Sequence, residues 1–117
     1  MTVWDRKKWH AMAADPAFVE YVIEQLDGAG RLTHKAMFGG HGIWESGDMF
    51  ALISSDSTLY FKIDDETRPR YEAAGSEQFM TMPYWSVPAD LLEDRGELLD
   101  WAADAIAVGH ATAKKRR

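Results

Sequence analysis

The sequence contains no cysteine among its 117 residues. This absence excludes disulfide bonds, thiolate metal sites and a cysteine nucleophile, and it is typical of proteins in a reducing compartment. No apolar run approaches the roughly 20 residues that a membrane-spanning helix needs. The basic residues at 6–8 are not followed by an apolar stretch, so no signal peptide is predicted. We therefore expect a cytoplasmic protein without a membrane partner.

Positive charge is in short supply. The chain has 13 Lys and Arg against 19 Asp and Glu, for a formal net charge of −6. Four of these basic residues stand together at 114–117, so the remainder of the chain is distinctly acidic. Such a body repels phosphate backbones on average, although a local basic patch can still bind them.

Apolar and aromatic residues are plentiful, at 46% hydrophobic with five Trp, five Phe and four Tyr. A chain of this length and composition can bury one core without a structural metal. We expect a single domain over 1–117, with an N-terminal extension at about 1–14 and a solvated, frayed basic tail at about 114–117. A short helix is an option within 3–14, although Trp4 and Trp9 would not share one helical face.

Three further segments have helical signals. Asp15 can cap a helix whose first position is proline, the apolar residues that follow recur at helical spacing, and Gly28 can end it. This pattern predicts a helix at 16–27. Helices are also predicted at 65–74, between an aspartate cap and a glycine stop, and at 88–113, where Gly96 can divide a short helix from a long one.

Strand-like runs occupy 35–44, 49–54 and 59–63, separated by short polar turns that are typical of β-hairpins. Two shorter extended stretches follow near 78–80 and 84–87. In the third run the residues alternate, which predicts one buried and one partly wet face of the sheet: Leu59, Phe61 and Ile63 against Tyr60 and Lys62. The predicted fold class is α+β, in the order α-β(3)-α-β(2)-α, with an antiparallel sheet packed against helices.

The glycine-rich segment 37–42, MFGGHG, is the natural place to look for a phosphate loop. Such a loop needs a helix N-terminus directly after the glycines, and here a hairpin follows instead. We therefore interpret the segment as β-strand, with a bulge or with glycines that allow close packing. Along a regular strand His34 and His41 would face opposite sides of the sheet, and no shared metal is predicted.

No catalytic motif is present. The sequence has neither H-E-x-x-H nor G-x-S-x-G, and its acidic clusters and serines occupy predicted turns and caps. We predict no catalytic residue, no metal site and no cofactor. The candidates for ligand binding or interaction are Phe38, Gly39, Gly40, His41, Tyr84 and Trp85, and those for nucleic acid are Lys114, Lys115, Arg116 and Arg117.

Several stretches together resemble the N-terminal domain of the TfoX (Sxy) family of competence regulators. The MFGGHGIW and MPYWSVP elements are specific only in combination. The resemblance extends from about residue 18 to about residue 110, and the stretches that carry it are 18–22, 37–44, 49–53, 59–62, 71–75, Phe79 and 82–88.

The resemblance implies an α-β(3)-α-β(2)-α fold similar to secretion-chaperone-like domains. It also implies a regulatory role linked to natural transformation and to co-activation with the cyclic-AMP receptor protein. Better-known members carry a second, helical domain, whereas this sequence ends soon after its last helix, so a stand-alone domain is expected. The resemblance supplies no catalytic residue.

These observations favour a non-enzymatic regulatory or protein-interaction module that affects transcription through a partner. We expect either a protein partner or self-association as a homodimer. Two alternatives stay open. One is a small-ligand or nucleotide-binding domain that uses His41, Tyr84 and Trp85. The other is a weak DNA-binding accessory protein that uses the basic residues at 114–117.

Overall fold

The computed structural model describes residues 13–116. The helix considered within 3–14 therefore lies, except for its last two positions, outside the described residues, as does Arg117. The described elements are, in chain order, α2 (Pro16–Gln25), β1 (Leu32–Met37), β2 (Gly40–Glu45), β3 (Asp48–Ile53), β4 (Leu59–Lys62), α3 (Arg68–Ala73), β5 (Tyr84–Ser86), η1 (Ala89–Glu93) and α4 (Arg95–Arg116).

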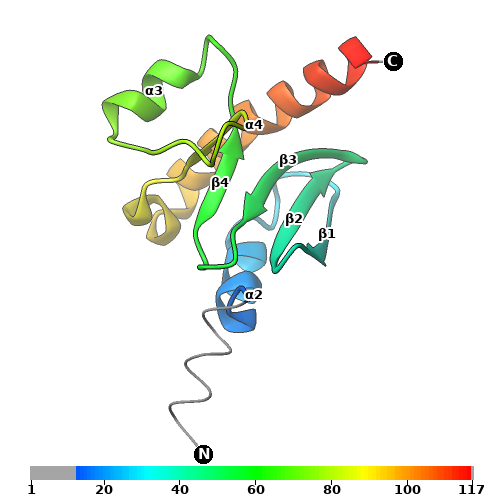
Figure 1. Cartoon of the computed structure of the whole chain (residues 1–117), viewed down its shortest axis with the longest axis vertical. Helices are drawn as coiled ribbons and strands as arrows, with labels where there is room; N and C mark the ends of the chain where they lie inside the picture. Colours follow the sequence, from blue (N-terminus) through cyan, green and yellow to red (C-terminus); the bar gives the residue numbers. More distant parts are fainter. Residues whose placement is uncertain (1–12, 117) are drawn as a thin grey trace, which may run out of the picture.

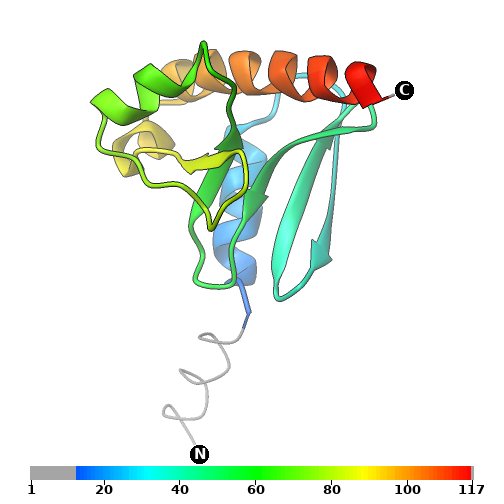
Figure 2. The same ribbon diagram turned by 45° about the horizontal axis from the view of Figure 1, so that its top comes forward.

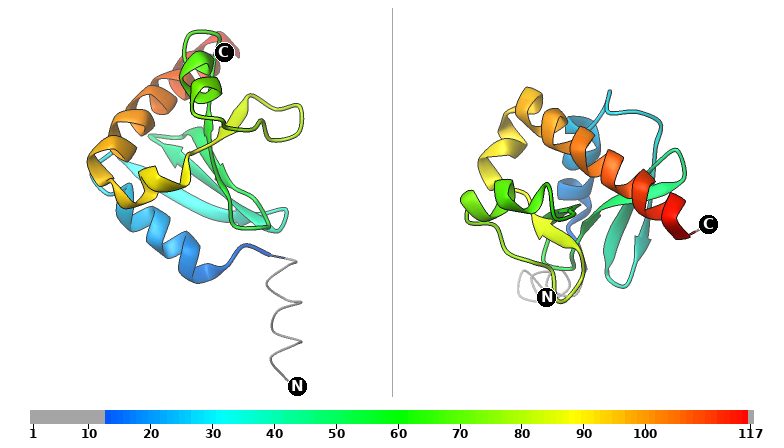
Figure 3. Two further views of the ribbon diagram at one scale, coloured as in Figure 1. Left: turned by 90° about the vertical axis from the view of Figure 1, so that its left-hand side faces the viewer. Right: turned by 90° about the horizontal axis from the view of Figure 1, so that it is seen from above.

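The five strands form one antiparallel sheet in the order β1-β2-β3-β4-β5. Figure 1 labels β1 to β4. Helix α4 runs across one end of the strands, and α2 lies behind them (Figure 2). Seen from the side, α2 and α4 lie on one face of the sheet, whereas the segment between α3 and β5, drawn yellow-green, projects on the other (Figure 3, left). We call the first face the helix face and the second the open face.

The core fills the space between the helix face and the two helices. Val22 of α2 and Leu26, the C-cap that follows the helix, have no exposed surface, as the predicted apolar stripe requires. Strands β2 and β3 pair out of step at one point. Ile43 of β2 pairs with Ala51 of β3, whereas the next residue of β2, Trp44, pairs with Met49. Phe50 is thus the extra residue of a β-bulge, and it packs tilted against Phe61 in the core.

Helix α3 is fixed to α4 by aromatic and ionic contacts. The buried Tyr71 ring meets Trp101 edge-on, with ring centroids 4.7 Å apart. The Arg70 guanidinium lies over the same Trp101 ring at 4.4 Å and forms ion pairs of 2.9 and 2.7 Å with Asp100 and Asp104. Burial raises the pKa of the Tyr71 phenol strongly, so this contact keeps its neutral form.

The predicted α+β class with its antiparallel sheet is confirmed. The N-cap of α2 is also confirmed, because Asp15 accepts a hydrogen bond from the backbone of Ala17 at 3.0 Å. The helix ends at Gln25 with Leu26 as its C-cap, two residues before the predicted end at 27, and Gly28 has the left-handed φ of +99° in the turn that follows. Helix α3 is shorter than the predicted 65–74, because Asp64 accepts bonds from the backbone amides of Glu66 and Thr67 and so closes a turn before the helix.

The run predicted as one strand at 35–44 is two strands, β1 and β2, joined by a turn at Phe38 and Gly39. The reading of 37–42 as a single strand was therefore wrong in this respect. The reason is the backbone: φ is +50° at Phe38 and +77° at Gly39, and positive φ at both central positions is what a two-residue hairpin turn requires. The stretch near 78–80 forms only an isolated bridge, between Gln78 and Trp85.

The expected close packing of the glycines is confirmed at Gly40. A Cβ atom there would lie 2.1 Å from the carbonyl oxygen of Ile53, so the backbones of β2 and β3 approach closely only because position 40 has no side chain. Gly109 does the same for α4, where a Cβ would lie 2.8 Å from the Met49 carbonyl oxygen.

The end of the last helix, predicted at 113, is a second correction. Helix α4 continues to Arg116, so Lys114, Lys115 and Arg116 are exposed residues of its last turn. Basic side chains are favourable there because they offset the negative end of the helix dipole. Among residues 13–116, no helix is both long and apolar enough to cross a membrane.

Candidate interaction site on the open sheet face

The open face holds an apolar groove with a volume of about 520 Å³. Its floor is the sheet, where Met37, Met49, Leu52 and Tyr84 line it. Its walls are the Phe38 turn on one side and the segment around Phe79, Met80 and Met82 on the other. Phe79 is held in place by Tyr60 of the sheet, with ring centroids 4.9 Å apart. The open face of the sheet therefore carries an apolar groove with two walls.

Two side chains on the walls of this groove are strongly exposed. Phe38 is 96% exposed and Met80 is 76% exposed. Both also have left-handed backbone, with φ of +50° and +54°. A bulky residue in this region is strained, and burial of neither side chain offsets the strain within the chain. Neither local conformation nor packing explains why these two positions are large and apolar.

The structure brings together four of the six candidates for ligand binding or interaction. Phe38, Gly40, His41 and Tyr84 all line the open-face groove. Gly39 lies instead in a second groove of about 550 Å³ between α2 and the first hairpin. Trp85 is adjacent to Tyr84 in β5 and so points to the helix face, where it packs against the core.

One end of the open face is basic. Lys62 is only 9% exposed, and its ammonium group lies over the Tyr84 ring at 5.6 Å. Burial lowers the pKa of Lys62, and the nearby charge of Arg116 lowers it further. Burial also raises the pKa of Tyr84 to about 12, so its phenol is neutral at physiological pH. The sheet face that carries Lys62 was predicted to be partly exposed to water, but Tyr84 covers the Lys62 side chain.

The two histidines that were predicted on opposite sides of the sheet are neighbours. Because a turn separates β1 from β2, His34 and His41 sit on adjacent strands, with His34 Nδ1 2.9 Å from His41 Nε2. Partial burial lowers the pKa of His41, as does the proximity of His34. Both rings line the groove beside α2. Among residues 13–116, no cluster of three or more His, Asp and Glu side chains could hold a metal ion.

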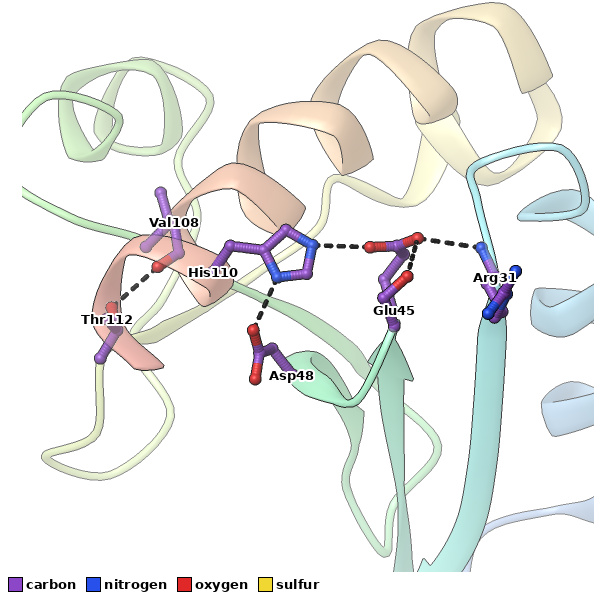
Figure 4. Close-up of polar contacts among 7 residues, drawn as sticks. Arg31, Glu45, Asp48, Val108, His110 and Thr112 are labelled. Carbon is purple, nitrogen blue, oxygen red and sulfur yellow. Dashed lines mark hydrogen bonds and ion pairs between the residues drawn. The ribbon is translucent and has the colours of Figure 1, made fainter. Parts of the chain in front are cut away.

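A third histidine, His110, joins α4 to the turn between β2 and β3 (Figure 4). His110 Nδ1 donates to Asp48 at 2.7 Å and Nε2 donates to Glu45 at 2.6 Å. Glu45 also accepts hydrogen bonds from the Arg31 amide and the Ser46 hydroxyl (Figure 4). We call the His110, Glu45 and Asp48 contacts the histidine clamp. With both ring nitrogens donating, His110 is an imidazolium, and these bonds raise its pKa.

Sequence reasoning missed most of the groove. Met80 was placed in the extended stretch near 78–80 and Met82 in the 82–88 stretch of the resemblance, and neither was a candidate for binding, yet with Phe79 they form one wall. The available signal was the cluster of Phe79, Met80 and Met82 outside any periodic element that could bury them, since flexible methionines are common at adaptable binding surfaces. The histidine clamp was also missed, because its partners lie 62 and 65 positions apart in the sequence.

A model of the TfoX N-terminal domain family matches residues 24–109, well over half of the chain. The chain belongs to the TfoX N-terminal domain family. The matched region of this TfoX-type chain includes all five strands, the groove walls and most of α4. A search of curated proteins gave no match.

Proposed function

We propose that this TfoX-type domain is a non-enzymatic regulatory module that acts by binding another protein through its open-face groove. The observation that carries the proposal is the pair Phe38 and Met80. Both are large, apolar, exposed and held in left-handed backbone on opposite walls of the groove. Strained residues that contribute nothing to the fold are typical of functional surfaces.

The composition of the groove favours a protein over a reacting substrate. Its described lining consists of apolar residues, two serines, Gly40, the buried Tyr84 and His41, and the His41 ring pairs with His34 in the groove beside α2. Catalysis needs a titratable group in reach of a nucleophile or an oxyanion donor, and the groove lining offers no such constellation. An effect on transcription through the bound partner is the role that the resemblance to competence regulators implies.

Site-specific photo-crosslinking tests the proposal. A photoreactive phenylalanine analogue at position 38 should form adducts with another polypeptide in cells that express the domain. The same analogue at position 21 is the matched control, since Tyr21 is an exposed aromatic on α2, away from the groove. Adducts at both positions, or at neither, would contradict the proposal.

A small apolar ligand is the second candidate, because a groove of about 520 Å³ falls in the range of small-molecule sites. A ligand that binds only the native state raises the melting temperature. A thermal-shift screen of apolar compounds and nucleotides should then give a stabiliser whose effect disappears in Tyr84→Ala. The absence of any stabiliser would exclude this candidate.

Weak binding of DNA through Lys114, Lys115 and Arg116 stays the third prediction. It requires an affinity that falls steeply with salt and is lost when these three residues are replaced by glutamine. A mobility-shift assay at low salt tests it directly.

A further inference from the structure

The open face has a projecting side chain and a hollow next to each other. Phe38 stands at the edge of the groove that it lines, with 96% of its side chain exposed. In an interface with two-fold symmetry each copy contributes the same patch, so a projection beside its own groove can be buried twice in one contact. A projection and a groove on opposite sides of the molecule would instead produce an open chain of copies.

The charges around the groove, like its shape, can complement those of a second copy. Asp56 and Glu77 both act on the Tyr60 phenol and help to raise its pKa, which places them near the end of β4 where that strand begins. At the other end of β4, Lys62 and Arg116 lie near Tyr84. One end of the open face is thus acidic and the other is basic.

The groups facing the basic end do not cancel its charge completely. Asp48 also acts on Lys62, but its carboxylate accepts a hydrogen bond from the charged His110. Lys114 and Lys115 precede Arg116 in the exposed last turn of α4. A two-fold axis that lies in the interface and runs perpendicular to β4 places the basic end of one copy opposite the acidic end of the other.

We propose that a second copy of this chain docks on the open face, with Phe38 of each copy in the groove of the other. The proposal rests on the proposed function, since it names a second copy as a protein that occupies the groove. Met80 on the far wall closes over the inserted ring. The acidic and basic ends of the two open faces then pair across the axis and set the orientation of the copies.

Sedimentation velocity over a wide range of concentration tests this with the full chain. The wild-type protein should show a monomer–dimer equilibrium. Phe38→Asn should weaken the dimer about 100-fold, because each substitution removes an anchor side chain twice in a symmetric interface. Asparagine tolerates left-handed backbone, so this variant keeps the turn.

The matched control is Tyr21→Ser, which removes an exposed aromatic from α2 together with its hydrogen bond to the Leu92 carbonyl oxygen. It should leave the dimer constant unchanged. A dimer that Tyr21→Ser weakens as much as Phe38→Asn does would overturn the proposal.

A charge exchange tests the orientation. Arg116→Glu and Glu77→Lys should each weaken the dimer several-fold, because each places like charges across the axis, and the double variant should recover most of the affinity. Additive weakening in the double variant would contradict the two-fold arrangement.

Two outcomes separate this inference from the proposed function. A wild-type chain that stays monomeric at every concentration, yet forms position-38 adducts with other polypeptides, overturns self-association and leaves the proposed function standing. A dimer that Phe38→Asn does not weaken overturns the groove as the contact between copies.

Discussion

Strand β2 begins after one tight turn, at Phe38 and Gly39, and ends at another, at Ser46 and Gly47. The backbones are alike, with φ of +50° and +77° in the first turn and +48° and +89° in the second. The side chains differ. Ser46 is small, and its hydroxyl donates to Glu45, whereas Phe38 is bulky and exposed.

The surroundings of the two turns differ in the same way. The Ser46 turn is joined to α4 by the histidine clamp and to the start of β1 by a 2.8 Å bond from its amide to the Arg31 carbonyl oxygen. The Phe38 turn receives one such bond, 2.8 Å from the Ala14 amide to the Gly39 carbonyl oxygen, and its side chain projects beside the groove. One turn serves the fold, and the other retains a residue that the fold does not need.

The largest expected effect concerns the glycines beside these turns. Gly40→Ala should destabilise the domain by about 3 kcal/mol, since the new Cβ would overlap the Ile53 carbonyl oxygen. Gly47→Ala is the matched control: nothing lies within 4 Å of its Cβ, and only its positive φ resists the change, at about 1 kcal/mol. Urea unfolding of both variants measures the difference. Equal losses of unfolding free energy in the two variants would contradict the close approach of β2 and β3 at Gly40.

The histidine clamp predicts a pH dependence. Folding raises the pKa of His110 above its ordinary 6.5, so its contribution is complete below pH 6.5 and is lost as the pH rises through the raised pKa. The backbone bond from Arg31 leads the causes that lower the pKa of Glu45 below its ordinary 4.5. The contribution of Glu45 is therefore complete above pH 4.5 and is lost as the pH falls through the lowered pKa.

His41 acts in the opposite direction, because its lowered pKa makes protonation below pH 6.5 cost stability. Comparing a variant with wild type at each pH cancels the contribution of His41, because both proteins contain it. Between pH 4.5 and pH 6.5, His110→Gln should lower the free energy of unfolding by about 1 kcal/mol relative to wild type. This figure allows for solvent screening, since the His110 ring is 39% exposed. The loss should shrink at alkaline pH and should be reproduced by Asp48→Asn. A loss independent of pH would contradict the clamp.

Much of the scaffold could be predicted from the sequence, because its signals are local. The cap at Asp15, the left-handed Gly28 and the alternation of Leu59 and Phe61 against Tyr60 each depend on neighbouring residues alone. The single domain over 1–117 stays a prediction of this kind.

The first turn could not be predicted in the same way. Hairpin signals depend on Asn, Asp or Gly at both central positions, and Phe38 occupies one of them against its conformational preference. That one misjudged turn placed His34 and His41 on opposite sides of the sheet. The groove and the histidine clamp depend on contacts between distant segments, which periodicity does not reveal.

The smallest effect is also the sharpest test of the comparison between the turns. At a concentration where the chain is monomeric, Phe38→Asn should raise the free energy of unfolding by about 0.5–1 kcal/mol, because strain is relieved and an exposed ring leaves no cavity. Ser46→Asn should change it by only a few tenths of a kcal/mol. A Phe38→Asn variant that unfolds as easily as a core truncation would show that Phe38 stabilises the fold, and would contradict its assignment to the interaction surface.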